Sequence, residues 1–190
     1  QFLAIAMGMA DTLMAASCGE AVVSGISLVD SICVLLIGLF TAMASGGAVV
    51  AAQYMGHGDK EMVGRASNQL FLAVGGVALL FMTIALVWNR GLLALLYGNV
   101  EADVMSAARI YFYIVAVSFP FLGIYNGGAA LFRAVGDSKR PLYFLVFSAC
   151  VNTVLDLVFV VKFHWGIAGV AWATVIAQGL SAVLILVVLF

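Results

Sequence analysis

Long apolar runs separated by short polar breaks dominate the sequence. A helix that spans a bilayer needs about 20 mostly apolar residues at a rise of about 1.5 Å per residue, and the pattern predicts six such helices. Their approximate ranges are 1–17, 21–55, 61–89, 102–135, 141–162 and 167–190. The breaks collect the glycine, proline and charged residues that favour helix ends and turns. Because the sequence lacks the short alternating segments of a transmembrane β-barrel, we expect an all-α fold, a bundle of six transmembrane helices.

The composition supports a membrane protein and removes one class of partner. Of the 190 residues, 65% are hydrophobic and 9% are charged, whereas an average soluble domain carries about 25% charged residues. The formal net charge of −1 lacks the basic excess that phosphate binding requires, so no nucleic acid is expected as a partner. The three cysteines form neither a metal-binding spacing nor a disulfide framework. The lipid bilayer is therefore the expected surrounding of the protein.

Lysine and arginine are distributed unevenly between the two sides of the predicted bundle. The breaks after the second and fourth spans, with their flanks, carry Lys60, Arg65, Arg133, Lys139 and Arg140, and the opposite side carries Arg90, Arg109 and Lys162. Short loops rich in lysine and arginine tend to remain in the cytoplasm. This bias predicts that the second and fourth breaks are cytoplasmic.

Three acidic residues, Asp11, Asp30 and Asp156, lie inside the apolar spans. No lysine or arginine lies deep in a span to neutralise them. An aspartate at the centre of a membrane helix costs roughly 2.5–3.5 kcal/mol on insertion scales, so such residues usually face a cavity or a partner and mark an ion or substrate path. We expect this role for Asp11 and Asp156. For Asp30 two interpretations stay open, an outer member of the same site or a solvated acid.

Oxygen-bearing side chains from several spans share one predicted depth. Asp11, Asp156, Tyr111 and Thr174 each lie 6–10 residues from an outer break, which places them about 10–15 Å below the outer surface. Asn152 precedes Asp156 by four residues, so both side chains project from the same helix face. Carboxylate, amide and hydroxyl oxygens are the ligands of small hard cations. This layer is therefore suited to a proton or a small cation, although Thr174 could instead bond its own helix and Tyr111 could be an interfacial aromatic residue.

The fourth span contains features that bend a helix. Pro120 removes one backbone hydrogen bond and clashes with the preceding turn, so we expect a kink there. Gly123, Gly127 and Gly128 follow and let a neighbouring helix approach closely. Asn126 lies among them, deeper than the acidic layer, and either lines a lower cavity or satisfies the backbone broken by the proline.

Several stretches, in their order and spacing, together resemble the multidrug and toxic compound extrusion (MATE) transporters. The resemblance extends over nearly the whole chain. It rests on residues 10–12, 27–31, 46–56, 131–141, 151–156 and 166–174. It implies a secondary antiporter of twelve helices in two six-helix lobes, with residues 1–190 as the amino-terminal lobe. Because the sequence starts and stops inside apolar runs, we expect it to be cut at both ends, with the carboxy-terminal lobe missing.

The same resemblance implies a function and a set of site residues. The implied function is the export of small organic, often cationic, compounds across the cell inner (plasma) membrane in exchange for H⁺ or Na⁺, without a cofactor and without enzymatic activity. By this resemblance the cation-coupling cluster, which would also hold Na⁺, consists of Asp11, Asn152, Asp156 and Thr174. The accessory positions of the cavity are Tyr111 and Asn126. Asp30 is kept as a further candidate of the cavity.

Two other functions stay open from the sequence. A flippase of the same superfamily acting on a lipid-linked sugar would need intramembrane arginine or lysine for the pyrophosphate, and this sequence has none deep in a span. An intramembrane aspartyl protease could use Asp11 and Asp156 as a carboxylate dyad. Its Gly-x-Gly-Asp signature falls one glycine short at residues 8–11. We therefore favour an antiporter that works by alternating access.

Overall fold

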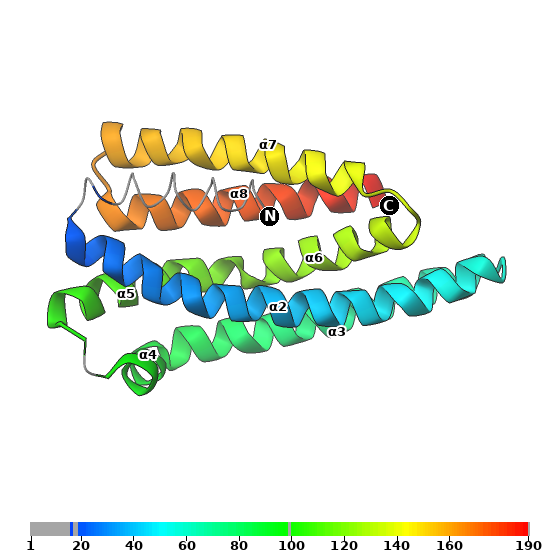
Figure 1. Ribbon diagram of the computed structural model, residues 1–190, viewed down its shortest axis with the longest axis horizontal. Coiled ribbons are helices and arrows are strands. Elements are labelled where there is room, and N and C mark those ends of the chain that lie inside the picture. Colours follow the sequence, from blue (N-terminus) through cyan, green and yellow to red (C-terminus); the bar gives the residue numbers. More distant parts are fainter. Residues whose placement is uncertain (1–15, 17–18, 99, 190) are drawn as a thin grey trace.

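The computed structural model describes residue 16 and residues 19–98 and 100–189. This part of the chain is helical and contains no strand. The helices are α2 (Glu20–Gly56), α3 (Lys60–Val87), α4 (Asn89–Tyr97), α5 (Ala102–Val115), the 3₁₀ turn η1 (Ala116–Ser118), α6 (Phe119–Ala134), α7 (Lys139–Asp156), the π-helical segment η2 (Leu157–Lys162) and α8 (Gly166–Leu189). The long helices lie side by side along one axis, with α7 and α8 at one edge of the bundle and α3 at the other (Figure 1).

Five helical segments are long and apolar enough to cross a bilayer. They are Glu20–Gly56, Lys60–Val87, Ala102–Ala134, Lys139–Lys162 and Gly166–Leu189. Their ends differ from the predicted second to sixth spans by at most two residues. The predicted all-α transmembrane bundle is therefore confirmed, while the predicted first span, 1–17, lies almost wholly outside the described residues.

The two turns predicted to be cytoplasmic are built in the same way. Each has a glycine with a left-handed backbone, Gly58 with φ 76° and Gly136 with φ 82°, followed by an aspartate. Asp59 accepts a hydrogen bond from the Met62 amide at 3.1 Å, and Asp137 accepts from the two amides that open α7 at 3.2 Å each. Such caps satisfy amides that a helix start leaves without a partner. Both turns lie at the same end of the bundle (Figure 1).

The fourth span is interrupted where Pro120 predicts a kink. α5 ends at Val115, η1 tightens the chain into a 3₁₀ turn, and α6 starts with the proline in its first turn. In a regular helix the amide of residue 120 would donate to the Ala116 carbonyl, but proline has no amide hydrogen. The Ala116 carbonyl accepts from the Phe119 amide instead. The regular α-helical bonding is thus interrupted beside the proline, and the bend itself stays a prediction.

Glycines of α6 let two neighbouring helices approach, as predicted. A Cβ atom on Gly123 would lie 3.1 Å from the Val74 side chain of α3, and one on Gly128 would lie 2.9 Å from Ile185 of α8. A side chain at either glycine would push the neighbouring helix away. α6 therefore joins the α2–α3 side of the bundle to α8.

The polar break expected between the third and fourth spans contains a helix that the sequence did not predict. α4 is nine residues long and is tied to the bundle by two side chains. The Tyr97 hydroxyl donates to the Leu28 carbonyl of α2 at 3.1 Å, and the Asn89 amide donates to the Arg109 carbonyl of α5 at 3.3 Å. A short segment with asparagine, arginine and glycine looks like a loop in sequence, and tertiary bonds stabilise it as a helix here.

Candidate ion and substrate site

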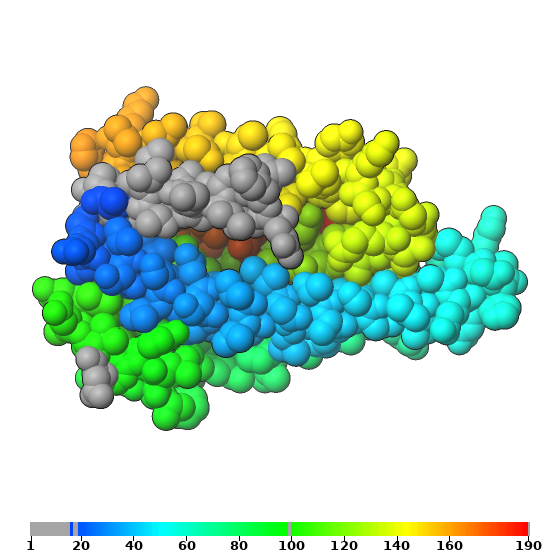
Figure 2. Space-filling view, in the orientation of Figure 1, coloured from blue at the N-terminus to red at the C-terminus, as the bar shows by residue number. Residues whose placement is uncertain are grey.

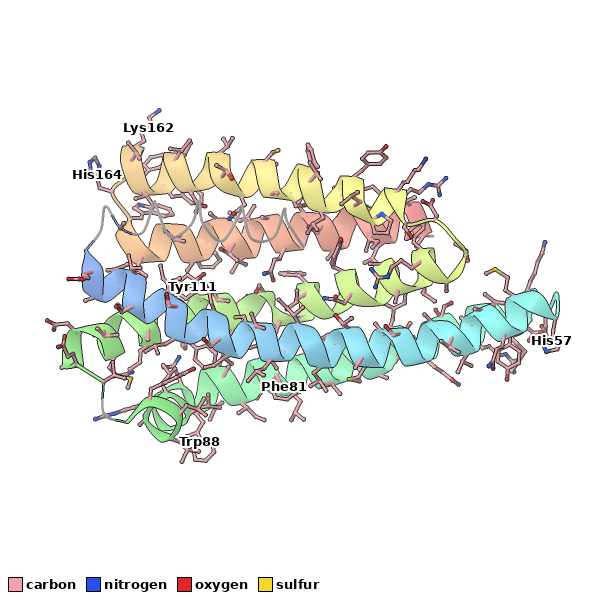
Figure 3. The ribbon with its side chains drawn as sticks, in the orientation of Figure 1. His57, Phe81, Trp88, Tyr111, Lys162 and His164 are labelled. Carbon is pink, nitrogen blue, oxygen red and sulfur yellow. The ribbon has the colours of Figure 1, made fainter. Side chains whose placement is uncertain are left out.

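The site builds on α7 and α8, two antiparallel helices that lie against each other over their whole length (Figure 1). Their connecting turn carries Lys162 and His164 at one end of the bundle, and His57 marks the opposite end (Figure 3). The space-filling view shows a hollow between α2 and α7, with atoms of α6 and α8 at its floor (Figure 2). A polar side chain on the inner faces of α7 or α8 is therefore shielded from lipid by protein.

The two polar residues that the sequence placed on one face of α7 are both buried. Asn152 is 2% exposed and Asp156 is 1% exposed. They stand one helical turn apart near the outer end of the helix. Among the described residues, the Asn152 Nδ2 atom has no hydrogen-bond partner. A carboxyl group and an amide buried this deeply in a membrane bundle form the centre of the candidate site.

A change in helix geometry begins directly after Asp156. α7 continues into the π-helical segment η2, and the outer turn beyond it is closed by an aromatic cluster in which the Phe159 and Trp165 rings stack at 5.0 Å. The Trp165 amide donates to the Phe159 carbonyl at 3.0 Å. Single π-helical turns occur frequently at functional sites. The wide turn lies directly beside Asp156, on the side predicted to face outward.

Thr174 of α8 takes part in its own helix. Its hydroxyl donates to the Val170 carbonyl at 3.1 Å and the side chain is partly buried. The hydroxyl hydrogen is therefore used, while the oxygen lone pairs stay available as acceptors. This bond matches the structural role anticipated for threonine and leaves a ligand role possible.

Tyr111 and Asn126 lie on the other helices of the bundle. Tyr111 of α5 is 3% exposed and packs within the apolar core. Asn126 of α6 donates to the Leu122 carbonyl at 2.8 Å and accepts from the Thr41 hydroxyl of α2 at 3.2 Å. Its amide therefore bridges α2 and α6. The Ala116 carbonyl, to which Pro120 cannot donate, already accepts from the Phe119 amide, and the backbone carbonyl that Asn126 contacts is that of Leu122.

Of the other two acids, Asp30 lies among the described residues and Asp11 does not. Asp30 lies on an exposed position of α2. Asp11 lies outside the described residues, so its meeting with Asp156 stays a prediction.

Three polar residues of the same helix pair escaped the sequence analysis. The Ser181 hydroxyl of α8 donates to the Ser148 hydroxyl of α7 at 2.6 Å, and both serines are buried. Gln178 of α8 has a buried Oε1 atom that finds no hydrogen-bond partner within the described part of the chain. The signal was present in the spacing, because Ser148 precedes Asn152 by four residues and Gln178 follows Thr174 by four.

The fold defines a polytopic helical membrane protein with a buried polar interface, the candidate site, inside its bundle. The sequence model of one family, described as MatE, matches residues 1–158. The chain therefore belongs to the MatE family, whose members are membrane transporters and not enzymes. The aspartyl protease alternative is thereby excluded.

Individual relatives agree with this assignment. A protein of Bacillus subtilis (strain 168), named "Probable multidrug resistance protein YpnP", is 30% identical over 169 residues, which are 89% of this chain and 36% of that protein. Two solved structures of a multidrug resistance MATE family transporter of the MOP superfamily, one outward-facing and one inward-facing, each match with a TM-score of 0.90. Their identities are 19% and 20%, over 99% and 97% of this chain and 41% of those chains. The chain thus spans less than half the length of these proteins.

Proposed function

We propose that residues 1–190 form the amino-terminal lobe of a twelve-helix secondary antiporter, which exports small organic, often cationic, compounds in exchange for H⁺ or Na⁺. The observation that carries this proposal is the burial of Asn152 and Asp156, one turn apart, inside a bundle of membrane-spanning helices. An acid at such a depth is costly and is usually retained where it binds an ion, a proton or a substrate. In a member of a transporter family, such an ion or proton would drive the movement of the substrate.

The coupling site would consist of oxygen atoms on two helices. The carboxylate of Asp156 and the amide oxygen of Asn152 come from α7, and the hydroxyl oxygen of Thr174 comes from α8. A monovalent hard cation favours such ligands, and a proton would need the carboxylate alone. Asp11, from the first predicted span, would bring a second carboxylate. Tyr111, Asn126 and Asp30 would belong to the wider cavity.

Exchange follows from the change in buried charge. A cation that enters from outside and binds Asp156 neutralises the carboxylate, and a cationic substrate then loses its attraction to the site and leaves outward. Release of the cation inside restores the charge. A ligand shifts a conformational equilibrium only by its differential affinity for the two states, and a buried charge provides a large difference. The lobe would move as one body against the second lobe, which is supported by its equal similarity to outward-facing and inward-facing structures.

One observation favours this antiporter over a flippase for lipid-linked sugars. The buried polar residues of the described chain are asparagine, serine and aspartate, without lysine or arginine among them. An anionic pyrophosphate would lack a positive partner in this lobe. An organic cation would find a carboxylate. We expect such an exporter to lie in the plasma membrane.

Ion-driven efflux from proteoliposomes that contain the full-length protein tests the proposal. Asp156→Asn should lower efflux driven by a proton or sodium gradient by at least tenfold, because the variant amide stays neutral throughout the cycle. Asp103→Asn makes the same change at an exposed residue at the start of α5 and should keep efflux within twofold of the parent. Equal efflux from Asp156→Asn and the parent protein would refute the proposed coupling role, and running the two gradients separately identifies the ion.

A further inference from the structure

The hydrogen bond between Ser148 and Ser181 fixes the register of α7 against α8. The hydroxyl oxygens are 2.6 Å apart, so these two residues face each other across the interface. The helices are antiparallel (Figure 1). A step toward the outer end therefore raises the residue number on α7 and lowers it on α8.

One turn outward from the serine pair, two amide side chains come level. Asn152 follows Ser148 by four residues on α7, and Gln178 precedes Ser181 by three on α8. Residues three or four apart lie on the same helix face. Asn152 and Gln178 thus occupy opposite sides of the same interface, at the level next to the serines.

The two amides leave complementary atoms without partners. Among the described residues, the Nδ2 donor of Asn152 and the Oε1 acceptor of Gln178 are buried and make no hydrogen bond, so these two atoms do not bond each other. Buried polar groups in native proteins nearly always have a partner, which is often an ordered water. A group that binds between them must accept from an N–H and donate to a carbonyl oxygen.

The chemistry of that group follows from this requirement. A bare cation would satisfy the oxygen of Gln178 and be repelled by the NH₂ of Asn152, while an anion would do the reverse. A hydroxyl group does both at once. We propose that Asn152 and Gln178 form a binding position for one neutral hydroxyl group, which is either a water molecule or the hydroxyl of an exported compound.

This position extends the site of the proposed antiporter inward by one turn. It rests on the proposed function only for the second source of the hydroxyl. Asn152 belongs to both parts of the site, because its amide oxygen would bind the cation while its amide N–H donates to the hydroxyl group. Gln178 would act on the hydroxyl group alone and leave the cation to Asp156.

A structure of the full-length wild-type protein at a resolution that shows ordered water, free of substrate and in sodium-free buffer, tests the first source. We expect density for one water between Asn152 and Gln178. We expect its loss in Gln178→Met, which keeps the length of the side chain and removes its hydrogen bonds. The matched control is Gln53→Met, at an exposed position of α2, in which the water should remain. An empty interface in the wild type, or density that appears only when sodium is added, would exclude water as the occupant, and the proposal is overturned if the hydroxyl preference tested next is absent as well.

Binding of two probes of equal size separates water from a substrate hydroxyl. Choline carries a terminal hydroxyl where propyltrimethylammonium carries a methyl group. If the substrate supplies the hydroxyl, choline should bind three- to tenfold more tightly than its analogue, and Gln178→Met should remove that preference. If the preference is absent while the water is seen, the water is the resident group. Because the water is sought without a gradient, its absence and the failure of Asp156→Asn to reduce efflux are independent results.

Discussion

Two helix interfaces of this bundle differ in their side chains, one being closely packed around a glycine and the other containing buried polar groups. α2 approaches α5 through Gly25, where a Cβ atom would lie 2.8 Å from the backbone nitrogen of Ala108. Where α7 approaches α8, the Ser148 and Ser181 hydroxyls are in hydrogen-bond contact, and the Nδ2 atom of Asn152 and the Oε1 atom of Gln178 have no hydrogen-bond partner among the described residues. The first interface has no space for another molecule at Gly25. The second contains a buried donor and a buried acceptor that could each form a further hydrogen bond. Close packing thus holds α2 against α5, and the polar interface is where we propose that ligands bind.

The largest effect on stability is expected from filling the tight interface. Gly25→Ala places a methyl group against backbone atoms of α5, which cannot move aside as a flexible side chain would, so we expect a loss of about 1–3 kcal/mol. Thermal unfolding in detergent measures it.

The control for this change is Gly38→Ala in the same helix, where a Cβ atom would have no neighbour within 4 Å. Alanine favours a helix over glycine by roughly 0.5–1 kcal/mol, so this variant should be equal to or more stable than the parent. Equal stability of the two variants would contradict the tight contact between α2 and α5.

A smaller effect is expected from the hydrogen bond of the polar interface. Ser148→Ala removes the partner of Ser181 on the other helix and leaves it the Ala177 carbonyl of its own. Interhelical hydrogen bonds in membranes contribute about 0.6 kcal/mol on average and up to about 1.7. A double-mutant cycle with Ser181→Ala measures the coupling between the two hydroxyls. Ser27→Ala is the control, since that hydroxyl bonds only the Val23 carbonyl of its own helix. A coupling energy of zero would mean that the serine pair does not set the register of α7 and α8.

The smallest effect is expected at α4, where a polar bond supports an otherwise apolar contact. Tyr97→Phe removes the bond to the Leu28 carbonyl and keeps the ring in place, so we expect a loss of about 0.5 kcal/mol, the low end for a neutral hydrogen bond. Amide hydrogen exchange in 89–97 should become faster. Tyr113→Phe, at a ring that is 55% exposed, should leave it unchanged. Unaltered exchange in Tyr97→Phe would show that α4 does not depend on this hydroxyl.

Sequence patterns predicted the membrane-spanning helices closely because both the length of a span and the glycine and proline at its ends are imposed locally by the bilayer and the backbone. The interruption at Pro120 is local in the same sense. α4 was missed because its stability comes from bonds to α2 and α5, which lie far away in sequence.

The candidate site divides along the same line. Asn152 and Asp156 were predictable, since their spacing on one helix is visible in the sequence. Gln178 was not singled out although it follows Thr174 by four residues, and only the register of α8 against α7 places it level with Asn152. That register depends on the contact between Ser148 and Ser181, which no property of either helix alone determines.

The π-helical segment η2 has a consequence for tolerance to deletion. A π-helical turn corresponds to an α-helix that has received one additional residue, and here that turn lies in Leu157–Lys162, on the outer side of Asp156. Removing one residue from most membrane helices keeps the backbone bonds but rotates everything beyond it by about 100°. In η2 the same removal would restore regular α-helical bonding, shorten the span by about 1.5 Å and leave every residue on the cytoplasmic side of Asp156 where it stands.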